Sequence, residues 1–217
     1  VAETDKVVLV TGASRGIGLE TAKALAQPGS GFSQVIMLAR PSQDLSDGCD
    51  YVAAINPNCN VLKIEADLSD AAACAKVFNI LDEQKIRLTT IVNNAGFTRP
   101  ASINEADLSD FQKTMQVNVY SPFQLIQIAL RQNHPLTHLI NIASTAGIGG
   151  RSGWLTYSAS KAAVISMSEV LRDELKPYGI DVICLSPGRC ATDLRKTLAP
   201  DEDPATIMQP DEVASII

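Results

Sequence analysis

The chain is poor in the residues that mark several common classes of protein. It has two histidines, no cysteine pair at CxxC spacing and no His/Cys cluster at metal-ligand spacing, so we expect no metal site. The five cysteines, an odd number, indicate reduced structural thiols and a cytoplasmic protein. No apolar run approaches the length that crosses a bilayer, and residues 1–6 carry no apolar signal segment.

Positive charge is also scarce. The 217 residues hold 18 Lys and Arg against 24 Asp and Glu, which gives a net charge of -6 at pH 7. Because nucleic-acid phosphates and anionic membrane surfaces attract basic proteins, we expect neither nucleic acid nor a membrane as a partner. Hydrophobic residues make up 46% of the chain, enough for a core. The length fits one domain, which we expect to span residues 1–217.

Short apolar segments rich in Val and Ile alternate with longer amphipathic segments. We expect strands at residues 6–10, 34–38, 60–64, 90–92, 138–142 and 181–185. We expect helices at residues 16–26, 71–83, 108–132 and 156–176, with Gly179 ending the last one. The alternation predicts an α/β fold: a doubly wound, Rossmann-type parallel sheet in a three-layer α/β/α arrangement.

A glycine-rich segment, residues 11–18 (TGASRGIG), joins the first strand to the first helix. A dinucleotide pyrophosphate binds free N–H groups at a helix N-terminus, and it needs glycines because a β-carbon would block its approach. The spacing Gly-x-x-x-Gly-x-Gly departs from the more familiar Gly-x-Gly-x-x-Gly. The segment indicates a dinucleotide site, although a tight strand-to-helix turn has a similar composition.

Polar residues also follow the fourth and fifth strands. Residues 93–96 (NNAG) come directly after the fourth strand, which in a doubly wound sheet lies beside the first strand, where the strand order reverses. Ligands bind at that point, outside the carboxyl ends of the strands. Ser144 follows the fifth strand, and its hydroxyl could donate to a substrate carbonyl oxygen. The alternatives are an ordinary Asn-Gly turn and a serine that caps a turn.

Tyr157 and Lys161 lie four residues apart, on one face of an expected helix. An ammonium group near a phenol favours the phenolate, so we expect the Tyr157 pKa to lie below its usual value of about 10. This shift would bring the phenol toward the range that suits general acid–base catalysis. The alternative is a pair of side chains on a solvated surface.

In their order and spacing, these residues resemble the short-chain dehydrogenases/reductases. The resemblance runs from residue 6 to about residue 217, and the positions that carry it are 11–18, Asp67, 93–96, Asn118, Ser144, Tyr157, Lys161, Pro187 and Gly188. It implies an oxidoreductase that transfers a hydride between a nicotinamide and the carbon of a carbonyl or secondary alcohol. In such enzymes the cofactor carries out the hydride chemistry and the protein positions it.

The resemblance also implies a role for each matching residue. Ser144 would hold the substrate oxygen, and Tyr157 would give a proton to that oxygen or accept one from it. Lys161 would bind the nicotinamide ribose and lower the Tyr157 pKa, while the Asn118 backbone carbonyl would hold a water linking Lys161 to solvent. The implied cofactor contacts are Gly12, Ser14, Arg15, Gly16, Ile17, Gly18, Arg40, Asp67, Leu68, Asn94, Ala95, Gly96, Tyr157, Lys161, Pro187, Gly188 and Thr192.

Within that set, Gly12, Gly16 and Gly18 would line the pyrophosphate and Asp67 would contact the adenine. Asn93, by contrast, would tie the central strands together.

Charge after the second strand predicts which nicotinamide cofactor binds. A carboxylate there would bind the 2′-hydroxyl of NAD and repel a 2′-phosphate. This chain has Arg40 instead, whose planar guanidinium suits a phosphate, and Arg15 is a second cation nearby. We therefore expect NADP (NADPH); the alternative is that Arg40 only stacks on the adenine.

The C-terminal part of the sequence contains the segments that we expect to line the substrate site and to end the sheet. Residues 189–208 resemble a small lid that is acidic toward its end. Ile148, Trp154 and Leu194 are apolar candidates for the substrate wall, although Trp154 could equally belong to the core or to a subunit contact. Family members usually continue into a seventh strand. The sequence stops at Ile217, so we expect that last strand to be missing here and the natural chain to be longer.

The sequence supports three functional hypotheses. In each of them we expect a homodimer or homotetramer, and the helices at 108–132 and 156–176 are a candidate interface. The first is an NADPH-dependent carbonyl reductase whose partner is a small ketone, aldehyde or alcohol. The second is a 3-oxoacyl carrier-protein reductase, which would need basic residues before the sixth strand, where Tyr178 stands with Lys176 close by. The third is an NADP-binding sensor or scaffold without turnover, against which the intact Ser144, Tyr157 and Lys161 set argues.

Overall fold

The structure, a computed structural model, describes residues 6–217; residues 1–5, which we expected to belong to the single domain, lie outside the described residues. Within residues 6–217, six strands form one sheet in the order β3-β2-β1-β4-β5-β6, and every neighbouring pair is parallel. The strands are β1 (Lys6–Thr11), β2 (Phe32–Ala39), β3 (Asn60–Glu65), β4 (Thr90–Asn93), β5 (His138–Ile142) and β6 (Asp181–Leu185). The predicted doubly wound parallel sheet is confirmed.

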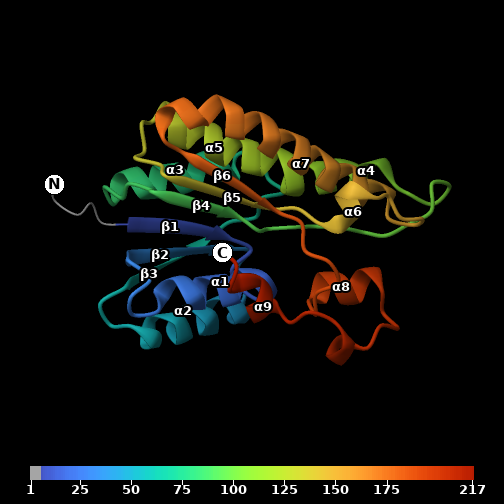
Figure 1. Cartoon of the computed structure of the whole chain (residues 1–217), viewed down its shortest axis with the longest axis horizontal. Coiled ribbons are helices and arrows are strands. Elements are labelled where there is room, and N and C mark those ends of the chain that lie inside the picture. Colours follow the sequence, from blue (N-terminus) through green and yellow to red (C-terminus); the bar gives the residue numbers. More distant parts are fainter. Residues whose placement is uncertain (1–5) are drawn as a thin grey trace.

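Helices cover both faces of this sheet, so the predicted three-layer α/β/α arrangement is confirmed as well. Figure 1 shows α1, α2 and α9 on one side of the sheet and α3, α5 and α7 on the other. The helices are α1 (Gly16–Ala26), α2 (Gln43–Ile55), α3 (Ala73–Glu83), α4 (Leu108–Met115), α5 (Ser121–Arg131), α6 (Thr145–Ile148), α7 (Leu155–Leu175), α8 (Asp193–Leu198) and α9 (Pro210–Ala214), with short helical turns η1 (Gln116–Tyr120), η2 (Lys176–Tyr178) and η3 (Pro204–Thr206).

Two hydrophobic clusters fill the spaces between the layers. Along β1, Val7 and Leu9 belong to the cluster beneath α3 and α5, whereas Val8 and Val10 belong to the cluster beneath α1 and α2. Successive side chains of a strand point to opposite faces, so a strand between two layers of helices must be apolar at every position. This requirement explains the unbroken apolar run of β1 and its place inside the sheet.

The predicted helices are present, with two differences. The helix expected at residues 108–132 consists of α4, the π-helical turn η1 and α5, which follow one another without a gap. The helices α2, α6 and α8 were not predicted. Ser42 caps α2 by accepting a hydrogen bond from the Leu45 N–H at 3.2 Å, and Leu45, Cys49 and Val52 bury its inner face. Gly179 ends the turn after α7 with φ of 72°, as expected.

Among residues 6–217, no helix has the length and the apolar character that crossing a bilayer requires. Over the same residues, no group of three His, Cys, Asp or Glu side chains is arranged to hold a metal ion.

Candidate functional site

A cleft of about 870 Å³ opens where the segments that follow the strands meet, around the point at which the strand order reverses between β1 and β4. Sixteen of the predicted cofactor contacts line it: Gly12, Ser14, Arg15, Gly16, Ile17, Arg40, Asp67, Leu68, Asn94, Ala95, Gly96, Tyr157, Lys161, Pro187, Gly188 and Thr192. The fold therefore brings residues that are as much as 180 positions apart in the sequence (192 - 12) to one cavity.

The glycine-rich turn forms one wall of the cleft. Gly12 and Gly16 have φ of 66° and 57°, in the left-handed region that other residues rarely adopt. Within the described part of the chain, no side chain caps the N-terminus of α1, and the first turn of that helix holds no acidic residue. The N–H groups and the dipole of the helix therefore favour an anion here, and the turn fits a pyrophosphate.

Gly18 does not line the cleft, contrary to our expectation that it would contact the pyrophosphate. A β-carbon at Gly18 would collide with the carbonyl oxygen of Gly12 and with the side-chain amide of Asn94. That amide donates to the carbonyl oxygens of Thr11 and Gly12 at 3.0 and 3.3 Å. Gly18 thus lets α1 pack against the ends of β1 and β4, and it supports the turn from behind.

Asn93 has the role that we expected. Its side-chain amide donates to Asn141 Oδ1 at 2.9 Å, and the Asn141 amide donates to Ser168 Oγ at 2.9 Å. These buried bonds join β4 to β5 and β5 to α7. The prediction that Asn93 ties the central strands together is confirmed.

Ser144, Tyr157 and Lys161 lie on the cleft wall that follows β5. Ser144 caps α6 and accepts a hydrogen bond from the Ala146 N–H at 3.2 Å. Tyr157 and Lys161 come from the first two turns of α7 and are 6% and 4% exposed. The Lys161 Nζ donates to the Ile142 carbonyl oxygen at 2.7 Å and lies 5.8 Å from the centre of the Tyr157 ring. This burial excludes the alternative of a solvated surface pair.

Burial dominates the ionisation of both groups. It raises the pKa of Tyr157, and hydrogen bonding with Ser144 and the positive charge of Arg195 offset that rise only in part. Burial lowers the pKa of Lys161 to about 8. Our expectation of a lowered Tyr157 pKa is therefore wrong, because the phenol packs in an apolar cluster with Leu198 where a phenolate would lose its hydration. A phenol that stays protonated at neutral pH is suited to giving a proton.

Asn118 lies behind these residues, in the π-helical turn η1, and does not line the cleft. Its side chain accepts from the Phe97 N–H at 2.8 Å and donates to the Phe97 carbonyl at 3.0 Å and to Ser160 Oγ at 2.9 Å. These bonds join the loop after β4 to α7. Single π-helical turns within α-helices are frequent at functional sites. The role of the Asn118 backbone carbonyl stays a prediction.

Gly147 sets how closely α6 approaches α7. A β-carbon here would lie 2.6 Å from the Lys161 carbonyl carbon and 2.7 Å from the Ala162 nitrogen. The two helices therefore touch backbone to backbone, and the spacing between Ser144 and Lys161 depends on this glycine.

At the opposite end of the cleft lie the groups that we expected at the adenine and its ribose. Arg40 is exposed after β2, and Arg15 forms an ion pair with Asp193 of α8, with Nη1 and Oδ2 2.9 Å apart. Burial tends to raise the Asp67 pKa, but hydrogen bonds from Ser69 and the charges of Arg40 and Lys113 hold it below its usual value. This end of the cleft thus offers two guanidinium groups and one carboxylate.

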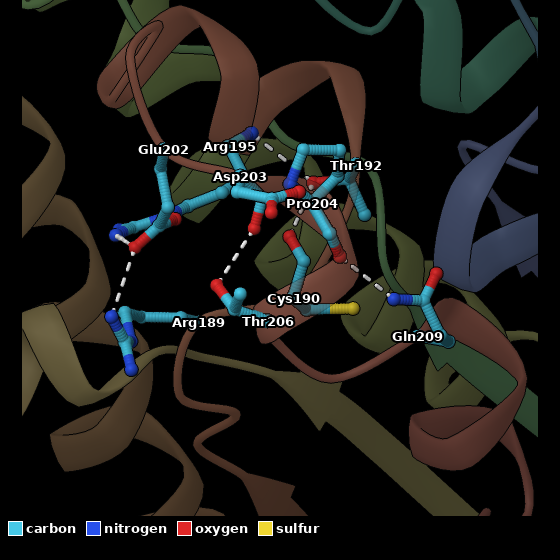
Figure 2. A network of polar contacts seen from close by, with 9 residues as sticks. All are labelled: Arg189, Cys190, Thr192, Arg195, Glu202, Asp203, Pro204, Thr206 and Gln209. Carbon is cyan, nitrogen blue, oxygen red and sulfur yellow. Dashed lines mark hydrogen bonds and ion pairs between the residues drawn. The ribbon is translucent and has the colours of Figure 1, made fainter.

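The segment 189–208 forms a further wall and is cross-linked by polar contacts, as Figure 2 shows. Glu202 accepts from Arg195 Nη2 at 2.7 Å and from Arg189 Nη1 at 3.2 Å, and the side chains of Glu202 and Arg195 are 15% and 14% exposed. The Gln209 side chain donates to the Pro204 carbonyl at 2.9 Å. The segment thus has a defined conformation.

Of the apolar candidates for the substrate wall, Trp154 and Leu194 line the cleft. Ile148 does not: its side chain is 73% exposed at the end of α6.

Sequence reasoning missed two basic residues in this part of the cleft. The guanidinium carbons of Arg151 and Arg195 each lie 5.2 Å from the centre of the Trp154 ring, and both residues line the cleft. A signal was present for each, since Arg195 falls in the segment 189–208 and Arg151 lies three residues before Trp154, a candidate for the substrate wall. The acidic residues toward the end of the 189–208 segment mask this basic signal in the composition.

Comparison with known proteins places this site in a family. The short chain dehydrogenase family profile matches residues 6–203. A 3-oxoacyl-[acyl-carrier-protein] reductase of Synechocystis sp. is 33% identical over 226 residues, which cover 99% of this chain and 88% of that protein. A solved short chain dehydrogenase from Salmonella enterica serovar Typhi has a TM-score of 0.87 at 31% identity, covering 98% of this chain and 88% of that chain.

A second solved structure, described as a short chain dehydrogenase from Escherichia coli CFT073 in complex with NADPH, has a TM-score of 0.86 at 30% identity and the same coverage. The chain belongs to the short-chain dehydrogenase family.

Proposed function

We propose that this protein is an NADP-dependent oxidoreductase that transfers a hydride between the nicotinamide and the carbon of a carbonyl or secondary alcohol. The observation that carries the proposal is the convergence of buried Tyr157 and Lys161 with Ser144 on the wall of a cleft that also holds a glycine-rich turn. The NADPH complex of the similar Escherichia coli protein supports the choice of cofactor.

The residues of the cleft fit NADP along its length. The N-terminus of α1 with Gly12, Ser14, Gly16 and Ile17 would hold the pyrophosphate. Arg40 and Arg15 would bind the 2′-phosphate, to which a guanidinium can donate two parallel hydrogen bonds. The remaining cleft residues of the predicted set divide between the two ends: Asp67, Leu68, Asn94, Ala95 and Gly96 at the adenosine, and Lys161, Pro187, Gly188 and Thr192 at the nicotinamide riboside.

When bound, the cofactor supplies or accepts the hydride, and the protein manages the proton. Ser144 would donate a hydrogen bond to the carbonyl oxygen, and Tyr157 would deliver its proton to the same oxygen. Lys161 is charged below its pKa of about 8, so it would stabilise the phenolate that remains. Burial raises the Tyr157 pKa, and the protonated phenol is the form that reduction of a carbonyl requires.

The finer features of the protein belong to the same proposal. We propose one domain over residues 1–217, a lid at residues 189–208, and a homodimer or homotetramer in the cytoplasm. Free thiols at all five cysteines of the described chain support a reducing compartment. A groove lined by Leu108, Phe111, Met115 and Tyr120 on α4 and η1 supports a subunit interface.

A panel of small ketones and aldehydes, followed by NADPH oxidation, tests the proposed function. We expect turnover of at least some members, with NADPH preferred over NADH. NADPH binding without turnover on any member would favour a sensor or scaffold instead.

A second candidate is a 3-oxoacyl carrier-protein reductase, which the similarity to the Synechocystis reductase favours. The panel therefore includes a 3-oxoacyl thioester presented both on acyl carrier protein and as a small analogue. Reduction of the protein-linked substrate alone would establish the second candidate.

A further inference from the structure

The part of the cleft around Tyr157 is basic, although the chain as a whole carries a net charge of -6. Three arginines line it, namely Arg151, Arg189 and Arg195. Figure 2 shows Arg189 and Arg195 reaching toward one carboxylate, that of Glu202. A concentration of positive charge on an acidic protein calls for a binding partner of the opposite sign.

Glu202 does not neutralise this charge. It forms ion pairs with both Arg189 and Arg195, so one negative charge faces two positive charges. Asp193, the nearby acidic residue of α8, is paired with Arg15 on the opposite wall. Over residues 6–217, no carboxylate lies within 4.0 Å of the Arg151 guanidinium. The three arginines therefore leave about two positive charges uncompensated beside the cleft.

Trp154 fixes the geometry of two of these arginines. Its ring contacts Tyr157, at 6.5 Å and an interplanar angle of 75°, and the guanidinium groups of Arg151 and Arg195, each at 5.2 Å. Such contacts of a cation with an aromatic ring hold the guanidinium in place. Arg195 Nε and Nη2 also donate to Glu202, whereas Arg151 has no carboxylate partner among residues 6–217 and keeps its N–H groups for a ligand. Tyr157 and the two cations thus contact the same aromatic ring.

An apolar surface adjoins both the phenol and the cations. Leu194 and Leu198 pack with Trp154 and Tyr157 in one small cluster. A complementary ligand therefore has three parts: a carbonyl at Tyr157, a short apolar stretch against Trp154 and Leu198, and an oxoanion at the arginines.

We propose that the substrate is a carbonyl compound that carries an oxoanion, a carboxylate or a phosphate, and that Arg151, with the charge of Arg195 near it, binds this group beside Trp154. The inference rests on the proposed function and names the substrate class of the same site. Planar guanidinium groups match both oxoanions, because their parallel N–H groups reach two oxygens at once.

Matched substrates test the inference. The rate of NADPH oxidation is compared for a 4-oxo carboxylic acid, its methyl ester and the corresponding oxoalkyl phosphate. We expect kcat/KM for at least one anion to exceed that for the ester by about tenfold or more, as expected for a charge-assisted pair of hydrogen bonds. A higher kcat/KM for the oxo acid would indicate that the natural substrate is a carboxylic acid. A higher kcat/KM for the phosphate would indicate a substrate that carries a phosphate group.

Variants assign the preference to the arginines. Arg151→Gln removes a charge at the cleft and should lower the ratio of anion to ester efficiency by about tenfold. Arg151→Lys keeps the charge without the planar fork and should recover part of the ratio. Lys196→Gln removes an exposed charge from α8 outside the cleft, so it should leave the ratio unchanged.

A binding measurement adds a readout that does not depend on turnover. Trp154 is the one tryptophan of the chain, so its fluorescence reports directly on the site of the two arginines. Butanoate and propyl phosphate are titrated into the wild-type protein and Arg151→Gln, both saturated with NADP⁺. We expect a saturable fluorescence change that weakens with added salt and in the variant.

The two failures are distinguishable. Turnover of the ester and the anions with equal efficiency, together with no fluorescence change for either anion, would overturn the inference and leave the proposed function standing. If no carbonyl compound is reduced while NADPH binds, the proposed function fails, and the substrate inference that rests on it fails with it.

Discussion

Arg15 of the glycine-rich turn and Asp193 of α8 form an ion pair across the cleft, with 2.9 Å between Nη1 and Oδ2. The pair joins the wall of the glycine-rich turn, where we propose that the pyrophosphate binds, to the segment 189–208. Both side chains are more than half exposed, so the pair is weak and open to competition. A 2′-phosphate bound at Arg15 would have to compete with the carboxylate of Asp193.

The first prediction removes this competitor. Asp193→Asn frees Arg15, so the Kd for NADPH should fall by about two- to fivefold, in keeping with the strength of an exposed pair, while the Kd for NADH should not change. Asp201→Asn, an exposed carboxylate of the same segment that does not line the cleft, is the control. Titration of both cofactors measures the effect, and a loss of NADPH affinity in Asp193→Asn would show that the pair assists binding.

The second prediction concerns Arg40. Arg40→Asp replaces attraction of the 2′-phosphate by repulsion, and its carboxylate could accept from the ribose hydroxyl of NADH. The kcat/KM for NADPH should fall by roughly tenfold or more while that for NADH holds or rises. High salt should narrow the wild-type preference. Equal loss with both cofactors would mean that Arg40 does not bind the phosphate.

The third prediction concerns the proton donor. Tyr157→Phe keeps the ring and removes the transferable proton, so turnover should fall by at least roughly a hundredfold. NADPH affinity, measured by titration, should change little. Near-normal turnover in this variant would remove Tyr157 from the mechanism.

The fourth prediction is a pH profile. The Lys161 pKa is lowered to about 8, so its ammonium is charged below that pH and neutral above it. The kcat/KM for carbonyl reduction should therefore decline as the pH rises through about 8, while the raised Tyr157 pKa keeps the phenol protonated over the same range. Lys161→Met should bind NADPH more weakly, show low activity at every pH and lack this decline. An unchanged profile in the variant would assign the decline to another group.

The fifth prediction concerns stability. His134 is buried, its Nδ1 accepts from the Leu88 N–H at 2.8 Å, and burial together with the Arg87 charge lowers its pKa to about 4. In the unfolded chain the imidazole takes up a proton near pH 6.5. The contribution of His134 to the free energy of unfolding is therefore fully present above that pH and is lost as the pH falls toward 4. Linkage puts the loss at up to about 3 kcal/mol.

Urea unfolding at pH 7.5 and pH 5 measures the His134 contribution. In His134→Asn, the free energy of unfolding should change much less between the two pH values than it does in the wild type. His138→Gln, a change at an exposed histidine, should retain it. A His134→Asn protein with the full pH dependence would contradict the prediction.

Much of the fold could be predicted because its signals are local. Each strand is an apolar run between polar segments, and β1 needs apolar side chains on both faces. The helix α2 was not predicted because Gly48 and several acidic residues interrupt the apolar pattern along it. Its stability comes from packing on the sheet. The π-helical turn η1 leaves no comparable pattern in the sequence.

The cleft residues that follow from motif order were also predictable, whereas electrostatic features were not. The pKa of Tyr157 depends on Leu198, a residue 41 positions away (198 - 157) that packs against it only in the folded chain. The place of Arg195 likewise depends on Trp154 and Glu202, which the fold brings together. The role of Gly18 depends on the close approach of Asn94.

The position of β1 between β2 and β4 also has a consequence for synthesis on the ribosome. The first partner of β1, Phe32–Ala39, emerges soon after it, but its second partner, Thr90–Asn93, follows about 80 residues later, an interval of roughly 4–16 s at typical rates of translation. During that interval one edge of a strand that is apolar from Val7 to Val10 has no partner within the nascent chain. Such an edge can pair with other polypeptides, so protection by chaperones matters most before residue 93 is available.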